Sequence, residues 1–177
     1  MAVSKYDKLI EVYESSRQDV IAYYSKCFIF FRDSIILGMP EFLGDDECIQ
    51  SFRPNQETGE KEEAKNQGRL IPRDDGFLYA GVDFMLSLKG NTEVHYRYYI
   101  GVKEIADAFS VKIFSDWHDP KGRVKREVRF EDKKDLKKLH NDFYAILIDD
   151  IKAGRDTWLH GGRKKANKLG FDLPDEI

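Results

Sequence analysis

Residues 92–103 alternate aliphatic side chains with side chains that can bind anions or stack on flat ligands. Alternate residues of a β-strand point to opposite faces, so His95, Arg97 and Tyr99 would share one face of a sheet. Flanking segments with the same alternation extend this set. The candidate binding face is basic and aromatic: His95, Arg97, Tyr99, Lys112, Phe114 and Arg129. Rings that stack on bases, beside cations that contact phosphates, are the components of a platform for single-stranded nucleic acid.

The same face has two other interpretations. It could be the solvated side of a two-layer fold, where Arg97 and the nearby acids Asp83 and Glu93 form ordinary cross-strand pairs. It could also be a surface that contacts another protein. The sequence patterns of known RNA-binding sheets are absent, so we expect the face to be the solvated side, with a protein contact as the next interpretation and nucleic acid as the last.

Residues 41–63 are rich in acids and hold few cations. The stretch 54–68 contains a single aliphatic residue, Ala64, and cannot bury enough apolar surface to offset the entropy lost on ordering. We therefore expect residues 54–76 to form a mobile loop. Acids of this region could attract a basic partner and speed its association. The candidates are Glu57, Glu60, Glu62 and Glu63.

Two basic motifs lie near the C-terminal end. Residues 163–168, RKKANK, could hold phosphates, although cations near the end of a helix are favourable without any ligand. Arg155 and His160 have the Arg-x4-His spacing that some helical ribonucleases use on phosphodiesters. Because the match specifies only two positions and that chemistry belongs to all-helical bundles, we regard it as coincidental.

The sequence shows no catalytic, metal or cofactor signature. The remaining histidines, His95, His118 and His140, lack metal-ligand spacing, and no cysteine pair accompanies them. The adjacent Asp149 and Asp150 would point in different directions from a helix. Phosphate loops, nucleophile elbows, dinucleotide fingerprints and zinc patterns are absent. We expect no cofactor and no metal, and catalytic activity is uncertain and not favoured.

The elements that would position these residues begin with a long N-terminal helix. Ser4 is a suitable N-cap, and Gly38 and Pro40 should end the helix. Its second half is apolar on more than one side, so we expect that half to lie between a sheet and another helix or a partner. The apolar residues recur at three- and four-residue steps: Tyr6, Leu9, Ile10, Tyr13, Val20, Tyr24, Cys27, Phe28, Phe31 and Ile35.

Four strands with clear two-residue alternation follow a short strand at 47–53. Short connections between them imply an antiparallel meander. The strands and their turns span 77–88, the turn 89–91, 92–103, 108–116, the turn 117–122, and 123–130. The side chains expected to face the core include Val82, Phe84, Tyr96, Tyr98, Ile100, Val111 and Ile113.

A second helix is predicted from Asp132 to about Leu159, followed by a tail at 161–177. Asp132 can cap this helix, and Asp135 lies in the first turn, where the helix dipole favours a carboxylate. The fold class is therefore α+β, with a four- to five-stranded antiparallel meander between two long helices that cover one sheet face. The length of 177 residues is consistent with a single domain over 1–177.

Composition adds little electrostatic bias. Charged residues make up 34% of the chain and the formal net charge is −3, so bulk charge favours neither nucleic acid nor an anionic membrane. The polar N-terminal stretch and the interrupted apolar run at 27–37 argue against a signal peptide and a membrane span, and predict a cytoplasmic protein.

These observations favour a non-catalytic interaction module, such as a small inhibitor, immunity or accessory protein that binds a larger protein. The first alternative is a nucleic-acid-binding module that uses the basic and aromatic strand face. The second is a small hydrolase or nuclease whose site carries no recognisable motif. The sequence leaves the oligomeric state open.

Overall fold

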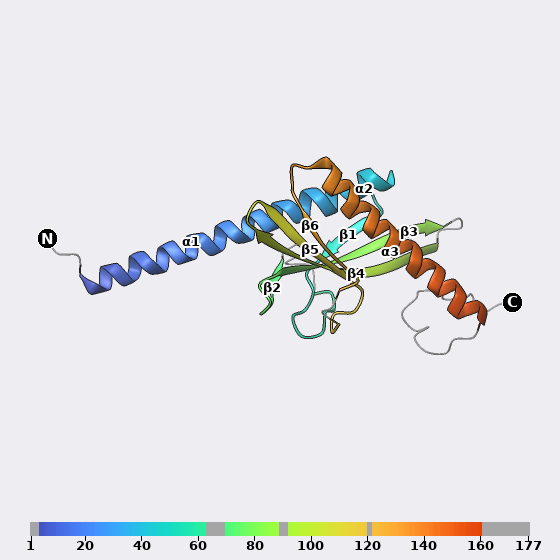
Figure 1. Cartoon of the computed structure of the whole chain (residues 1–177). Coiled ribbons are helices and arrows are strands. Elements are labelled where there is room, and N and C mark those ends of the chain that lie inside the picture. The colour runs from blue at the N-terminus through green and yellow to red at the C-terminus, as the bar shows by residue number, and fades with distance from the viewer. Residues whose placement is uncertain (1–3, 63–69, 89–91, 120–121, 161–177) are drawn as a thin grey trace.

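The computed structural model describes residues 4–62, 70–88, 92–119 and 122–160, with the backbone alone at 88, 92 and 156–160. Within this range a long helix precedes an antiparallel sheet and a second long helix follows it (Figure 1). The expected α+β class is therefore confirmed. The basic run 163–168 and the tail 161–177 lie outside the described residues.

The N-terminal helical region consists of three consecutive segments: α1 (Lys5–Phe31), η1 (Arg32–Leu37) and α2 (Gly38–Leu43). Ser4 caps α1 as expected. Its hydroxyl accepts from the Asp7 amide at 3.1 Å, and the Asp7 carboxylate accepts from the Ser4 amide at 3.2 Å. This reciprocal pair satisfies two donors that the first turn would otherwise leave free.

The expectation that Gly38 and Pro40 end this helix is wrong. The π-helical segment η1 leads directly into α2, where Pro40 is the third residue. Amides in the first turn of an α-helix need no partner within that helix, so proline is tolerated there. The helix ends instead at Gly44, whose φ of +78° is left-handed and closes the last turn.

The strands form one antiparallel sheet in the order β1-β3-β4-β5-β6, and β2 also pairs with β3. Val82 lies opposite Tyr98, and Ile100 lies opposite Ile113. The expected meander is thus confirmed for β3 to β6. The strands span Ile49–Phe52 (β1), Ile71–Pro72 (β2), Leu78–Leu88 (β3), Thr92–Ile105 (β4), Ala108–Phe114 (β5) and Val124–Val128 (β6).

The second long helix, α3 (Lys133–His160), begins where the sequence predicts. The Asp132 carboxylate accepts from the Lys134 amide at 2.8 Å. Farther along, Tyr98 donates to Asp150 at 2.8 Å, so α3 is tied to the central strand β4.

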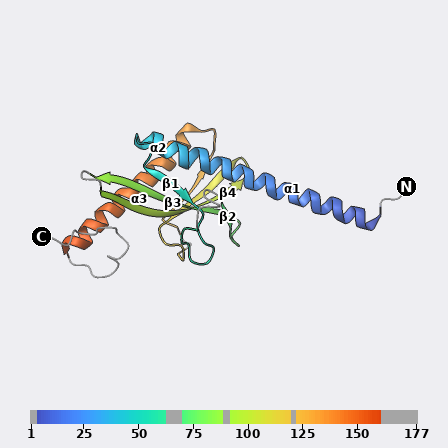
Figure 2. The same cartoon turned by 180° about the vertical axis from the view of Figure 1, so that it is seen from behind.

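Helices from both ends of the chain pack on the same sheet face. The buried cluster there joins residues of α1, η1, α2 and α3 to the strand residues that alternation assigns to the core. Its members include Cys27, Phe30, Ile35, Met39, Val82, Phe84, Tyr98, Ile100, Val111, Ile113, Leu139 and Phe143. Only the second part of α1 takes part, and the first part runs away from the body (Figures 1 and 2).

Candidate functional site

The second sheet face, expected to be solvated, is covered by an aromatic cluster. Tyr99 and Phe114 lie on this face, as their alternation predicts, but only 6% and 2% of their surface is exposed. The expectation that these two rings are exposed is therefore wrong, and neither can stack on a base or touch a partner directly. The second-face cluster consists of Phe52, Ile71, Phe77, Tyr79, Tyr99, Phe114 and Trp117.

Residues 53–62 fold back across this cluster and cover it. The Tyr99 hydroxyl donates to the Gly59 carbonyl at 2.9 Å, and the Trp117 indole donates to the Gln56 carbonyl at 3.1 Å. The polar segment thus supplies backbone acceptors to buried donors that would otherwise be unsatisfied. Residues 63–69 of the expected mobile loop 54–76 lie outside the described residues, and the mobility of the loop stays a prediction.

Asp75, just before β3, binds two side chains of the second sheet face. Tyr79 donates to its carboxylate at 2.5 Å, and Lys112 Nζ lies 2.9 Å from the same oxygen. Burial acts to raise the pKa of Asp75, but the hydrogen bonds from Tyr79 and Lys112 outweigh it and the pKa is lowered. Burial, reinforced by Asp75, raises the pKa of Tyr79 far above its usual value, so the phenol stays protonated and donates. Lys112 is therefore engaged within the protein.

Arg97 and His95 are exposed members of the expected binding face and lie on the same strand, β4. Arg97 donates from two nitrogens to the buried Asp83 carboxylate, at 2.8 and 3.2 Å, which is the cross-strand pair expected for a solvated face. Its guanidinium carbon lies 4.7 Å from the centre of the Phe52 ring. His95 Nε2 lies 3.6 Å from the Glu93 carboxylate at the surface. Arg97 thus covers Phe52 at the edge of the second-face cluster, and its own side chain remains partly exposed to solvent.

Arg129 does not join Arg97 and His95. It follows β6 and lies 2.9 Å from Asp132 and 3.0 Å from Asp135, at the start of α3. The strand register places this corner at the opposite end of β4 from His95. The six basic and aromatic residues therefore do not form one continuous platform.

The four acidic candidates also differ in their surroundings. Glu57 and Glu60 are exposed on the segment that covers the second-face cluster. Glu62 is half-buried and pairs with Arg53 at 2.7 Å. Glu63 lies outside the described residues. The acids free to attract a partner are thus Glu57 and Glu60.

The titratable groups considered for chemistry have structural contacts. His140 lies on α3 and packs against the N-terminal helical region, with Nε2 2.7 Å from the Ser34 carbonyl. Asp150 accepts from Tyr98 and Arg123. Within the described part of the chain, no group of three His, Cys, Asp or Glu side chains is placed to hold a metal ion. The His160 side chain lies outside the described atoms.

Most exposed large apolar side chains of the described residues lie on the first part of α1. Every residue from 5 to 22 is exposed. Patches of this kind mark contact sites on soluble proteins. The exposed stripe contains Tyr6, Leu9, Ile10, Val12, Tyr13, Val20 and Ile21.

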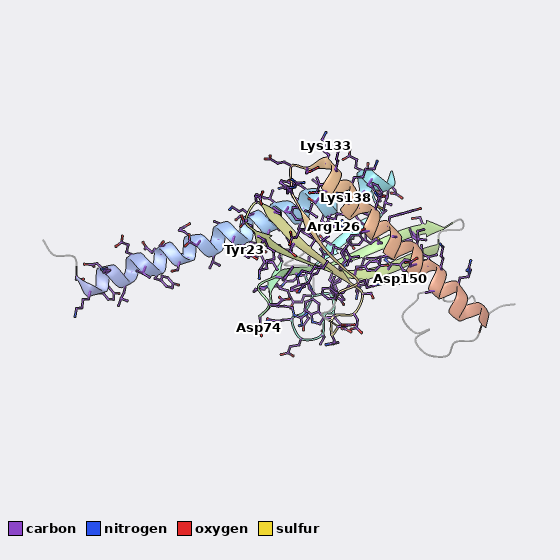
Figure 3. The ribbon with its side chains drawn as sticks, viewed as in Figure 1. Tyr23, Asp74, Arg126, Lys133, Lys138 and Asp150 are labelled. Atoms are coloured by element: carbon purple, nitrogen blue, oxygen red, sulfur yellow. The ribbon has the colours of Figure 1, made fainter. Side chains whose placement is uncertain are left out.

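The body of the protein begins at Tyr23. Its hydroxyl donates to the Gly76 carbonyl at 2.8 Å, and the next residue, Tyr24, accepts from the Leu70 amide at 3.0 Å. Burial raises the pKa of Tyr23 to about 12, so its hydroxyl remains a donor. Figure 3 labels Tyr23 where α1 reaches the rest of the molecule, and the side chains before it extend into solvent.

Sequence analysis identified the periodic apolar residues of α1 and expected only its second half to be covered, without proposing the first half as a contact surface. The pattern that predicts an amphipathic helix is the same whether the apolar side meets a sheet or stays free. A signal was nevertheless present, because only the second half of the N-terminal helix is apolar on more than one side. The candidate contact surface is therefore the exposed stripe, a feature that the search for charged and aromatic residues missed.

No protein-family model matches the chain, and no curated protein or solved structure is significantly similar to it. Among the described helices, none combines the length and apolar character that crossing a bilayer requires.

Proposed function

We propose that the chain is a non-catalytic interaction module that binds another protein through the exposed stripe of α1. The observation that carries this proposal is a projecting helix whose residues 5–22 are all exposed within the described part of the chain. An inhibitor, immunity or accessory protein would use such an arm to hold a larger partner.

The low stability of an unpacked helix supports the presence of a binding partner for the first part of α1. A helical segment of this length is marginal in water when it stands alone, because tertiary packing supplies most helical stability. Exposed Tyr6, Leu9 and Tyr13 add an unfavourable contact between apolar surface and water. Burying this stripe against a second apolar surface would stabilise both the helix and the complex.

The exposed residues of the covered sheet face form a second, smaller contact surface in this proposal. They are His95, Arg97, Glu57 and Glu60. The nucleic-acid alternative rested on exposed rings beside free cations. Tyr99 and Phe114 are buried and Lys112 is paired, so no specific observation now favours it.

Capture from an extract of the source cells tests the proposal. The tagged full chain is compared with a Leu9→Asp/Tyr13→Asp variant and with a Ser15→Asp/Gln18→Asp control, which adds the same charge on the other side of the helix. We expect the wild-type and control chains to retain the same protein after nuclease treatment, and the stripe variant to lose it.

Three results would contradict the proposal. One is equal capture by the stripe variant. Another is capture that depends on Arg97 or Glu60 in place of the stripe, or that disappears with nuclease. The third is that the wild-type chain retains no protein in a larger amount than the stripe variant does.

A further inference from the structure

The exposed stripe of α1 continues the buried stripe of the same helix without a change of period. Cys27 and Phe30 are fully buried against the sheet, whereas Tyr6, Leu9 and Tyr13 are about two-thirds exposed. Alternating steps of three and four residues define the seam of a two-helix coiled coil. The seam residues are Tyr6, Leu9, Tyr13, Ser16, Val20, Tyr23, Cys27 and Phe30.

We infer that the free part of this seam packs against α1 of a second copy of the chain, in antiparallel orientation. This inference rests on the proposed function, because it uses the same exposed stripe and makes a second copy of the chain one partner of that stripe. Side chains beside a seam set the orientation of paired helices. Here they are Lys5, Ile10, Val12, Arg17 and Asp19. Lys5 at the start of α1 and Asp19, about one turn before the body, can meet only when the two helices run in opposite directions.

One antiparallel register forms two kinds of seam pair, in which a large apolar side chain meets either a second large side chain or a serine. Leu9 of each copy packs against Tyr13 of the other, in the centre of the contact. Tyr6 of each copy lies beside Ser16 of the other, where the two hydroxyls can share a hydrogen bond. Both residues of each pair are exposed in the single chain.

The flanking residues agree with this register. Ile10 and Val12 each lie near the two-fold axis and meet the same residue of the second copy, which extends the apolar contact on both sides of the seam. Lys5 of each copy lies beside Asp19 of the other. In a parallel pair Lys5 would face Ile10, and Asp19 would face Tyr24, so neither charge would find a partner.

The dimensions of α1 also fit. Each buried tyrosine removes about 150–250 Å² from water. Tyr6, Tyr13 and the aliphatic side chains of the stripe would together bury a surface area approaching the ~800 Å² per partner of a stable interface. Lys5 lies level with Arg17–Asp19 of the second copy, before the body of that copy begins at Tyr23, so the two bodies do not collide. The contact uses the same surface on both copies and closes as a dimer.

Sedimentation velocity over a concentration series measures the association. We expect the wild-type chain to form a dimer, and Leu9→Asp to weaken dimerisation by about tenfold or more because it buries a charge at the centre of the seam. Gln18→Asp adds the same charge to the outer side of α1 and should leave dimerisation unchanged.

A wild-type chain that stays monomeric, or a Leu9→Asp chain that dimerises equally well, would overturn the second-copy inference. Neither result would decide the proposed function, because capture from extract tests binding to other proteins separately. Capture of a different protein by a monomeric wild-type chain would support the proposed function alone.

Cysteine cross-linking tests the orientation. Leu9→Cys and Tyr13→Cys chains are mixed and oxidised with a glutathione buffer, while the native Cys27 and Cys48 are buried. The antiparallel register predicts a disulfide between the two different variants. Disulfides that join identical variants would indicate a parallel pair, and failure to form the mixed disulfide would also overturn the register.

Discussion

Gly59 lies where residues 53–62, which cover the second sheet face, pass close to Trp117. Its φ is +75°, and a Cβ there would lie 2.4 Å from Trp117 Cβ and Cγ. The Gly59 carbonyl also accepts the buried Tyr99 hydroxyl. Glycine is needed here for two reasons, its backbone conformation and the close approach of Trp117.

We predict that Gly59→Ala lowers the free energy of unfolding by about 2–4 kcal/mol, from left-handed strain plus displacement of Trp117. Gly44→Ala is the matched control, because Gly44 has a φ of +78° but nothing within 4 Å of its added Cβ. The control should lose only about 1 kcal/mol. Urea unfolding followed by tryptophan fluorescence measures both, and equal losses would contradict the packing of the cover on Trp117.

His140 gives the fold a pH dependence of defined sign. Burial lowers the pKa of His140 below its usual value of 6.5, against smaller opposing effects of the Ser34 carbonyl and Glu41. Between the lowered pKa and 6.5 the unfolded chain binds more protons at this residue than the folded chain. The stability that His140 contributes is therefore present above 6.5 and falls as the pH drops towards the lowered value.

We predict that the wild-type chain loses its stability advantage over His140→Gln as the pH falls from neutral through this interval. Glutamine can still donate to the Ser34 carbonyl but carries no titrating group. Free energies of unfolding at a series of pH values measure the difference. His118→Gln, at an exposed turn residue, serves as the control. A difference between wild type and His140→Gln that is constant with pH would contradict the account.

Sequence patterns predicted the face of each strand residue but not what covers that face. Tyr99 and Phe114 show the distinction, because alternation placed them on the correct side and could not reveal the segment above them. That segment covers them largely with backbone, through Gly59 and Gln56, and so it lacks the apolar pattern of a covering element. Exposed Arg97 was predicted correctly because its partner Asp83 lies directly across the strand pair.

At the scale of elements, periodicity predicted the two long helices and strands β3 to β6 with small errors at the ends. The local signals agreed with the observed structure, as the caps at Ser4 and Asp132 show. The prediction from Pro40 was wrong because proline occurs both just after the end of a helix and in the first turn of a new one, as it does here in α2. The wide turns of η1 before it have no recognised sequence signature.

The sequence predicted that the second half of the N-terminal helix is covered, but it did not show that the apolar side of the first half stays exposed. Tyr6, Tyr13 and Val20 repeat the spacing of Cys27, yet only Cys27 lies over the sheet. Which part of a long amphipathic helix is covered depends on where the strands end, and this is a property of the tertiary structure. The candidate contact surface emerged only when exposure was known along the whole helix.

At the scale of the molecule, both sheet faces are covered and, among the described residues, the first part of α1 has an exposed apolar side. One face carries the helices, and the other carries residues 53–62 above the aromatic cluster. A partner can therefore bind the stripe of α1 without displacing a segment that already covers the sheet. This reasoning gives α1 the central place in the proposed function.

The central claim is that this stripe is a contact surface, and its pairing with a second copy is tested most directly by hydrogen exchange on the full chain at low and high protein concentration. The account predicts that amides of residues 5–22 become protected as the concentration rises, that strands β3 to β5 do not change, and that Leu9→Asp abolishes the added protection. Rapid exchange of residues 5–22 at every concentration, or new protection confined to the sheet around Arg97, would contradict it.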